Sequence, residues 1–277
     1  MFDQEIAGSN GIYGHYTWSS FLNVQKRLGR QQIALYPLPS HLWLNHVRCS
    51  GLEPLKTSLK EAGITVNSFH PMRHQYSLFE DPDSLRGSSS MQYYRRCTDV
   101  ASALGCTTLC LRPGGSLLDG DHQRDWERMV HNLRELTTYA RSHGVRLCIQ
   151  TVHPDEGVLM TTCTELEHLL NVVPDLGAAL DTVSISQAGE SIPQWFACFG
   201  ENIRHICFWD GRNGGGRIWG MGVYPSLLYA RQLLESGYDG PLSICGFTQR
   251  YDENPEEADA ENLARVQRLF LSFREGV

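Results

Sequence analysis

Three short apolar runs decide the fold expected for this chain: LGAALDT (176–182), IRHICFWDG (203–211) and PLSICGF (241–247). Each run carries one chemically reactive residue near its carboxyl end, namely Asp181, Cys207 and Cys245. Nearly continuous apolar runs of this length are typical of strands buried in a parallel sheet. In a parallel α/β barrel the loops that follow the strands build the active site, so these residues mark the expected site.

The same pattern extends over the whole chain, because short β-rich runs alternate with longer amphipathic stretches. We expect eight strands, near residues 4–8, 32–36, 64–69, 107–112, 145–151, 177–181, 203–209 and 242–246. Helices are expected over 52–63, 90–105, 125–144, 163–173, 192–200 and 226–237, several ending in Gly as a helix C-cap does. This alternation predicts a (β/α)8 TIM barrel, an α/β fold, that occupies residues 1–277 as a single domain.

Composition narrows the class of protein. The chain has a formal charge of −7, and it has no Lys/Arg cluster long enough to follow a phosphate backbone. A nucleic-acid partner is therefore disfavoured. No signal peptide or long apolar segment is present, which predicts no membrane association. The nine cysteines lack CxxC pairing, and we expect reduced, mostly buried thiols and a cytoplasmic location.

Several phrases, taken together and in order, resemble the xylose-isomerase-like sugar isomerase/epimerase superfamily, in particular its fructoselysine 3-epimerase-like branch. They are SFHP (68–71), DPDSLRGSSSMQYYRRCTDVASALG (81–105), RPGG (112–115), LDTVSISQAGES (180–191), FGENIRHICFWDG (199–211), IWGMG (218–222) and SGYDGPLSI (236–244). The resemblance covers nearly the whole chain. It implies a xylose-isomerase-like barrel that handles a ketose-like or polyhydroxylated small molecule at its carboxyl-terminal mouth, and it implies a homo-oligomer.

The resemblance also implies a metal site, which this sequence alters. Members hold one divalent metal with a Glu, an Asp, a His and a second Glu, and these positions fall on Gln150, Asp181, Cys207 and Cys245. Only Asp181 is retained. The two glutamates of the family exchange a proton with the carbon beside the substrate carbonyl, and a carboxamide such as Gln150 cannot take up a proton.

Cys207 and Cys245 leave three interpretations open. They fill an abandoned site as small apolar side chains, they bind zinc together with Asp181 and Gln150 or a nearby His, or they form a redox-active thiol pair. We expect either no cofactor or a divalent metal, and zinc rather than manganese, because thiolates favour zinc.

Proton transfer, where it occurs, needs other groups. Glu156 matches a family glutamate that contacts substrate, while His70 and His153 follow predicted strands and titrate near neutral pH. With Asp181 orienting the ligand, these are the candidate catalytic residues.

Four further residues are candidates for substrate binding. Trp219 lies in a loop that folds over the substrate in the family, Arg212 and Arg217 flank a glycine-rich loop, and His74 follows the third predicted strand. The alternative to an enzyme is a catalytically silent barrel that binds a ligand or a partner protein.

Overall fold

A computed structural model describes residues 5–44, 49–72, 76–152, 158–212, 215–244 and 249–273. Eight parallel strands close into a barrel in the order β1-β10-β7-β6-β5-β4-β3-β2. Their bounds are β1 Ile6–Ser9, β2 Gln32–Leu35, β3 Thr65–Phe69, β4 Thr108–Leu111, β5 Arg146–Ile149, β6 Gly177–Asp181, β7 Ile203–Cys207 and β10 Leu242–Ser243. All eight strands lie where the sequence predicted them, and the expected TIM barrel is confirmed.

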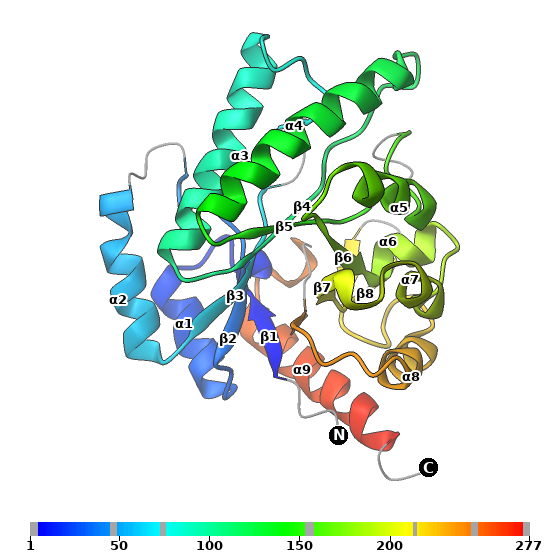
Figure 1. Ribbon diagram of the computed structural model, residues 1–277. Helices are drawn as coiled ribbons and strands as arrows, with labels where there is room; N and C mark the ends of the chain where they lie inside the picture. The colour runs from blue at the N-terminus through cyan, green and yellow to red at the C-terminus, as the bar shows by residue number, and fades with distance from the viewer. Residues whose placement is uncertain are drawn as a thin grey trace.

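Helices follow the strands and surround the barrel (Figure 1). They are α1 Trp18–Arg27, α2 Glu53–Ala62, α3 Leu85–Ala103, α4 His122–Ser142, α5 Cys163–Val172, α6 Thr182–Gln187, α7 Ile192–Phe199, α8 Ser226–Glu235 and α9 Pro255–Ser272. Short 3-10 turns are η1 Asn10–Ile12, η2 Cys49–Leu52, η4 Gly200–Asn202 and η5 Gln249–Tyr251. The sequence patterns had indicated neither α1, α6 nor α9.

Local capping residues explain where several helices begin. Thr162 and Glu165 form a reciprocal capping box at the start of α5, so that two otherwise unpaired backbone N–H groups are satisfied. The start of α1 has the same chemistry, because the Thr17 side chain accepts a hydrogen bond from the backbone of Ser20. Helix α6 is capped by Asp181, a residue that the sequence had marked for a different role.

A small hairpin lies between β7 and α8. Strands β8 Asp210–Arg212 and β9 Gly215–Arg217 pair antiparallel. The buried Asp210 carboxylate accepts hydrogen bonds from the backbone N–H groups of Gly211, Gly220, Gly222 and Tyr224, at 2.7 to 3.3 Å. A methyl group at Gly222 would collide with this carboxylate, so glycine is required there. One carboxylate thereby holds the backbone of Gly211 close to that of Gly220, Gly222 and Tyr224.

A buried polar network connects α9 with residues that precede β2. Arg30, which precedes β2, forms an ion pair of 2.6 Å with Asp259 in α9, and both side chains are less than a tenth exposed. Gln25 and Tyr13 donate to the same carboxylate at 2.8 and 3.0 Å. The network fastens the last helix against the first βα unit, beside the β1–β10 seam that closes the barrel.

The cysteine side chains that the structure describes are free thiols: Cys97, Cys106, Cys110, Cys148, Cys163, Cys198 and Cys207. Burial raises the pKa of the Cys106 thiol to about 12, although its bond to the Thr108 carbonyl opposes that shift. In the described part of the chain, no helix is both long enough and apolar enough to cross a membrane.

Candidate functional site

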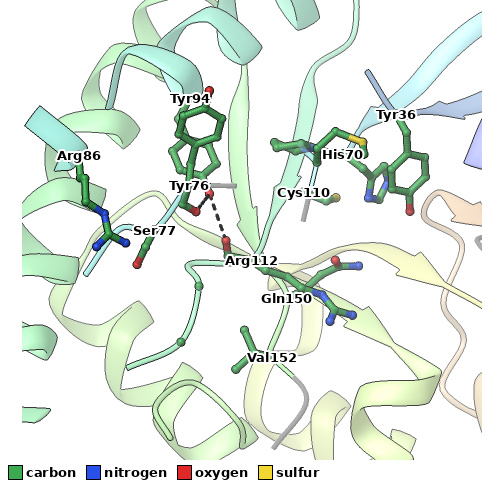
Figure 2. A pocket seen from close by; sticks show the side chains of 14 residues that line it. Tyr36, His70, Tyr76, Ser77, Arg86, Tyr94, Cys110, Arg112, Gln150 and Val152 are labelled. Atoms are coloured by element: carbon green, nitrogen blue, oxygen red, sulfur yellow. Dashed lines mark hydrogen bonds between the residues drawn. The ribbon is translucent and has the colours of Figure 1, made fainter. Parts of the chain in front are cut away.

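A cavity of about 250 Å³ lies at the carboxyl ends of β2, β3, β4 and β5. Its lining residues are Tyr36, His70, Pro71, Met72, Tyr76, Ser77, Arg86, Tyr94, Cys110, Arg112, Gly114, Gly115, Gln150 and Val152. Figure 2 shows Tyr36 and His70 on one side of the cavity and Tyr76 and Tyr94 on the other. We call this part of the barrel mouth the cavity side.

Tyr36 and His70 form one wall of the cavity side. Their rings stack with centroids 4.8 Å apart. The backbone of Tyr36 is held by Asn10, whose carboxamide accepts from its N–H at 2.7 Å and donates to its carbonyl at 2.8 Å. His70 contacts the hydroxyl of Ser68 at 2.8 Å through Nε2. The cavity therefore has an aromatic wall whose position is fixed by the buried residues Asn10 and Ser68.

The opposite part of the mouth, over β6 and β7, is filled, and we call it the filled side. Asp181 ends β6 and is 1% exposed. Its Oδ1 accepts from the backbone N–H groups of Val183 and Ser184 and from the indole Nε1 of Trp209, at 2.9 to 3.1 Å. Its Oδ2 accepts from the guanidinium of Arg112 at 3.1 Å. The carboxylate thus caps a helix and forms a buried ion pair.

Gln150 and Cys207 meet where the resemblance places two metal ligands. The carboxamide Nε2 of Gln150 lies 3.0 Å from Sγ of Cys207, in hydrogen-bonding geometry. Cys207 also packs in an apolar cluster with Val183 and Trp209 of the filled side, and with Ala34, Tyr36 and Leu38 on and after β2. A small apolar cluster occupies this part of the barrel mouth.

These contacts do not fit a hard divalent metal at the family positions. Such a metal needs several oxygen ligands with free lone pairs, whereas the carboxylate of Asp181 is already bonded to Arg112, Trp209 and two backbone N–H groups. Gln150 presents a carboxamide and Cys207 a sulfur atom. The fourth position, Cys245, lies outside the described residues.

Three other predicted site residues also lie outside the described residues: His74, His153 and Glu156. Of the predicted catalytic residues, His70 lines the cavity and Asp181 lies on the filled side, where Arg112 connects the two. Arg112 both lines the cavity and donates a hydrogen bond to Asp181, so it lies at the junction of the cavity side and the filled side.

The predicted substrate-binding residues that the structure describes lie away from the cavity. Trp219 is 2% exposed, stacks on Phe208 with centroids 4.2 Å apart and donates its indole N–H to the Phe208 carbonyl. That position leaves no open face on which a sugar could stack. Arg212 is exposed on β8, and Arg217 borders a smaller cavity near Tyr251 and Asn262.

Sequence reasoning missed three residues of the site. Arg112 stood within the quoted RPGG phrase, but nothing in the sequence connects it with Asp181, which lies 69 positions later. Tyr36 ends a predicted strand, which was a usable signal for a lining residue. His205 stood within the quoted run IRHICFWDG and is buried, but its proximity to His70 depends on the closure of the barrel.

A family description, the xylose isomerase-like TIM barrel, matches residues 12–269 of this chain. The chain belongs to this family. Fructoselysine 3-epimerase from Shigella flexneri is 23% identical over 250 residues, which cover 87% of this chain and 89% of that protein. D-psicose 3-epimerase from Enterocloster bolteae is 22% identical over 231 residues, covering 74% and 72%.

Solved structures of the family share the fold. L-ribulose 3-epimerase superposes with a TM-score of 0.79 at 15% identity, covering 98% of this chain and 96% of that one. D-psicose 3-epimerase from Clostridium cellulolyticum H10, solved with D-tagatose, gives 0.74 at 18% identity, covering 92% and 94%. A xylose isomerase-like protein from Mycobacterium smegmatis, in complex with magnesium, gives 0.70 at 16% identity, covering 98% and 97%. The fold is therefore shared with proteins that bind sugars and with one that binds a divalent metal.

Proposed function

We propose that this chain binds a ketose-like, polyhydroxylated molecule in the cavity over β2–β5, without a hard divalent metal at positions 150, 181, 207 and 245. One observation carries the proposal: the carboxylate of Asp181 is bonded to Arg112, Trp209 and two backbone N–H groups. The related epimerases named above support the class of ligand.

Arg112 takes over the electrostatic role of a cation next to Asp181. Its guanidinium is permanently charged, is 9% exposed and lines the cavity. When a base removes the proton beside a ketose carbonyl, negative charge develops on the carbonyl oxygen. A fixed cation in a site shielded from water stabilises such charge.

The proton itself is carried by the candidate acid/base groups His70, Glu156 and His153. A neutral imidazole or a carboxylate accepts a proton near pH 7, whereas the carboxamide of Gln150 does not. Proton transfer beside the carbonyl, with return of the proton to the other face, gives epimerisation. Return to the neighbouring carbon gives isomerisation.

Turnover measured with and without metal tests this proposal. Full-length protein stripped with a chelator is incubated with D-psicose or fructoselysine, and sugar products are separated by chromatography. We expect that adding manganese leaves the rate unchanged. Turnover that requires manganese would overturn the proposal.

A catalytically silent, ligand-binding barrel is the second candidate function. It is favoured by the contact between Gln150 and Cys207, because no proton acceptor then stands at the first of the family's glutamate positions. Epimerisation that Glu156→Gln abolishes would exclude this candidate. The matched control is Glu167→Gln, since Glu167 is exposed on α5.

The side chains at the family metal positions also determine which metal binds there. We expect zinc in preference to manganese, because sulfur and nitrogen donors favour zinc. Elemental analysis of purified protein checks this expectation, and stoichiometric manganese would contradict it. We further expect a cytoplasmic homo-oligomer, and sedimentation analysis measures its oligomeric state.

A further inference from the structure

Two histidines and a cysteine lie together inside the barrel. One ring nitrogen each of His70 and His205 and the sulfur of Cys207 all lie within 4.8 Å of one another. The three side chains are at most 2% exposed. Only Cys207 belongs to the family metal positions, so this is a different group of possible ligands.

Barrel geometry brings these residues together. His205 and Cys207 are two residues apart on β7, so their side chains point to the same face of the strand. His70 follows β3, on another part of the barrel wall, and its ring meets that of His205 edge to face at 5.1 Å. The cluster is therefore fixed by closed strand pairing rather than by a mobile loop.

Each member of the cluster has a polar neighbour of the kind that orients metal ligands. His70 Nε2 lies 2.8 Å from the Ser68 hydroxyl, and His205 Nε2 lies 2.7 Å from the Ser243 hydroxyl. Hydrogen bonds of this type fix the ring orientation and the tautomer of a metal-binding histidine. The amide of Gln150 contacts the Cys207 sulfur, an arrangement that stabilises a thiolate.

One nitrogen of the cluster lacks a partner. The Nδ1 atom of His205 is buried and makes no hydrogen bond within the described part of the chain. Buried polar atoms are almost always paired, so this nitrogen is available to bind a water molecule or an ion. In the tautomer in which Nε2–H donates to the Ser243 hydroxyl, the neutral imidazole presents its lone pair at Nδ1.

We propose that His70, His205 and Cys207 form a zinc site inside the barrel. Two imidazoles and one thiolate suit Zn²⁺, which binds nitrogen at about 2.0–2.1 Å and sulfur at about 2.3 Å. With the ligand atoms no more than 4.8 Å apart, each needs to move by less than about 1 Å to reach these distances. Zinc replaces the thiol proton of Cys207, which is released to solvent.

The lining of the cavity gives the ion a route to this site, because His70 and Gln150 both border the cavity. Three protein ligands also match the count in catalytic zinc sites, where water or substrate completes the tetrahedron. The site does not rest on the proposed function. In the zinc-bound state His70 is a ligand, and proton transfer falls to Glu156 or His153.

Cobalt titration of the full-length, metal-stripped protein tests the site. Co²⁺ reports on zinc sites, and a cysteine ligand gives a thiolate-to-cobalt charge-transfer band. We expect this band to saturate at one equivalent and to disappear when zinc is added. Wild-type protein that shows no such band would overturn the proposal.

Matched variants then identify the ligands. Cys207→Ser should abolish the band, whereas Cys97→Ser should leave it intact, because Cys97 is a buried thiol in α3, outside the strands of the barrel. Ser243→Ala should weaken zinc binding about 10- to 100-fold while the band stays. This milder variant serves if Cys207→Ser does not fold.

Cys245→Ser distinguishes this site from a zinc site at the family positions. We expect it to retain both the band and the zinc affinity. Loss of the band in Cys245→Ser would place the metal at the family positions and overturn the assignment to His70 and His205.

Discussion

The two sides of the barrel mouth differ in what their polar groups do. On the cavity side, over β2–β5, the side chains of Tyr36, His70 and Gln150 border open space. On the filled side, over β6 and β7, Asp181 caps a helix and holds Arg112, and Trp209 packs beside it. The difference teaches that one half of a barrel mouth can be structural while the other half encloses a cavity.

This division has an energetic consequence that can be tested. Substitutions on the filled side should reduce the free energy of unfolding, because they break buried interactions. Substitutions on the cavity side should reduce ligand affinity with little change in stability. The four predictions that follow run from the largest expected effect to the smallest.

Removal of the buried carboxylate should have the largest effect. Asp181→Ala leaves Arg112 buried without its ion-pair partner and removes the cap of α6, and we expect a loss of about 3–5 kcal/mol in the free energy of unfolding. Urea denaturation measures it. The double variant Asp181→Leu with Arg112→Met should lose less than the single one, because no unpaired charge remains. A loss below about 1 kcal/mol in Asp181→Ala would show that the filled side is not structural.

The loop held by Asp210 is the second test of the filled side. Gly222→Ala places a methyl group against the Asp210 carboxylate and the Gly211 carbonyl, and we expect destabilisation of about 1–3 kcal/mol. Thermal unfolding measures the change. Gly14→Ala is the matched control, since a methyl group there meets open space. Equal melting temperatures for the two variants would contradict the role of Asp210.

A cavity-side substitution should change binding instead of stability. Tyr36→Phe removes one hydroxyl from the cavity wall, and the loss of one hydrogen bond of about 0.5–1.5 kcal/mol predicts roughly 2- to 13-fold weaker ketose binding. Calorimetric titration with D-psicose measures the affinity. A fall in unfolding free energy larger than the fall in binding energy would remove the distinction between the two sides.

Acid should weaken the support behind the cavity wall. Burial lowers the pKa of His41 from its ordinary 6.5, although the bond to the Tyr16 carbonyl opposes the shift. The folded state therefore favours neutral His41. The stability that this preference contributes is complete above pH 6.5, and it is lost as the pH falls from 6.5 toward the lowered pKa. Its protonation would also set a second N–H against the Asn10 amide, 3.0 Å away.

Chemical denaturation from about pH 8 to pH 5.5 measures the free energy of unfolding. In His41→Asn, this free energy should decline less than in wild type around the ordinary histidine pKa. His131→Asn is the control, because His131 is exposed on α4. A decline of the same size in His41→Asn and in wild type would assign it to other groups.

The barrel was predictable from sequence because its strands are short apolar runs separated by amphipathic helices. The strand at 177–181 matches β6 residue for residue, since every member is buried. Helix α6 escaped prediction because it lasts six residues and is capped by a residue expected to bind metal. Helix α9 begins at Pro255 and carries acidic residues in its first turn, which are signals that could have found it.

The candidate site was less predictable, because it depends on contacts between distant positions. The resemblance identified Gln150, Asp181 and Cys207, and the structure brings Gln150 and Cys207 into contact. No periodicity or spacing reveals that Arg112 neutralises Asp181 or that His70 lies beside His205, because closure of the barrel creates both pairs.

The ion pair between Arg30 and Asp259 limits how early during synthesis the first βα unit can complete its packing. The partners are 229 positions apart, so a ribosome that adds about 5–20 residues per second produces Asp259 roughly 10–45 s after Arg30. Through that interval the arginine must stay hydrated, because burying it alone is costly. The first βα unit therefore cannot reach its final packing until Asp259 has been made, and barrel closure is a late step in the folding of this chain.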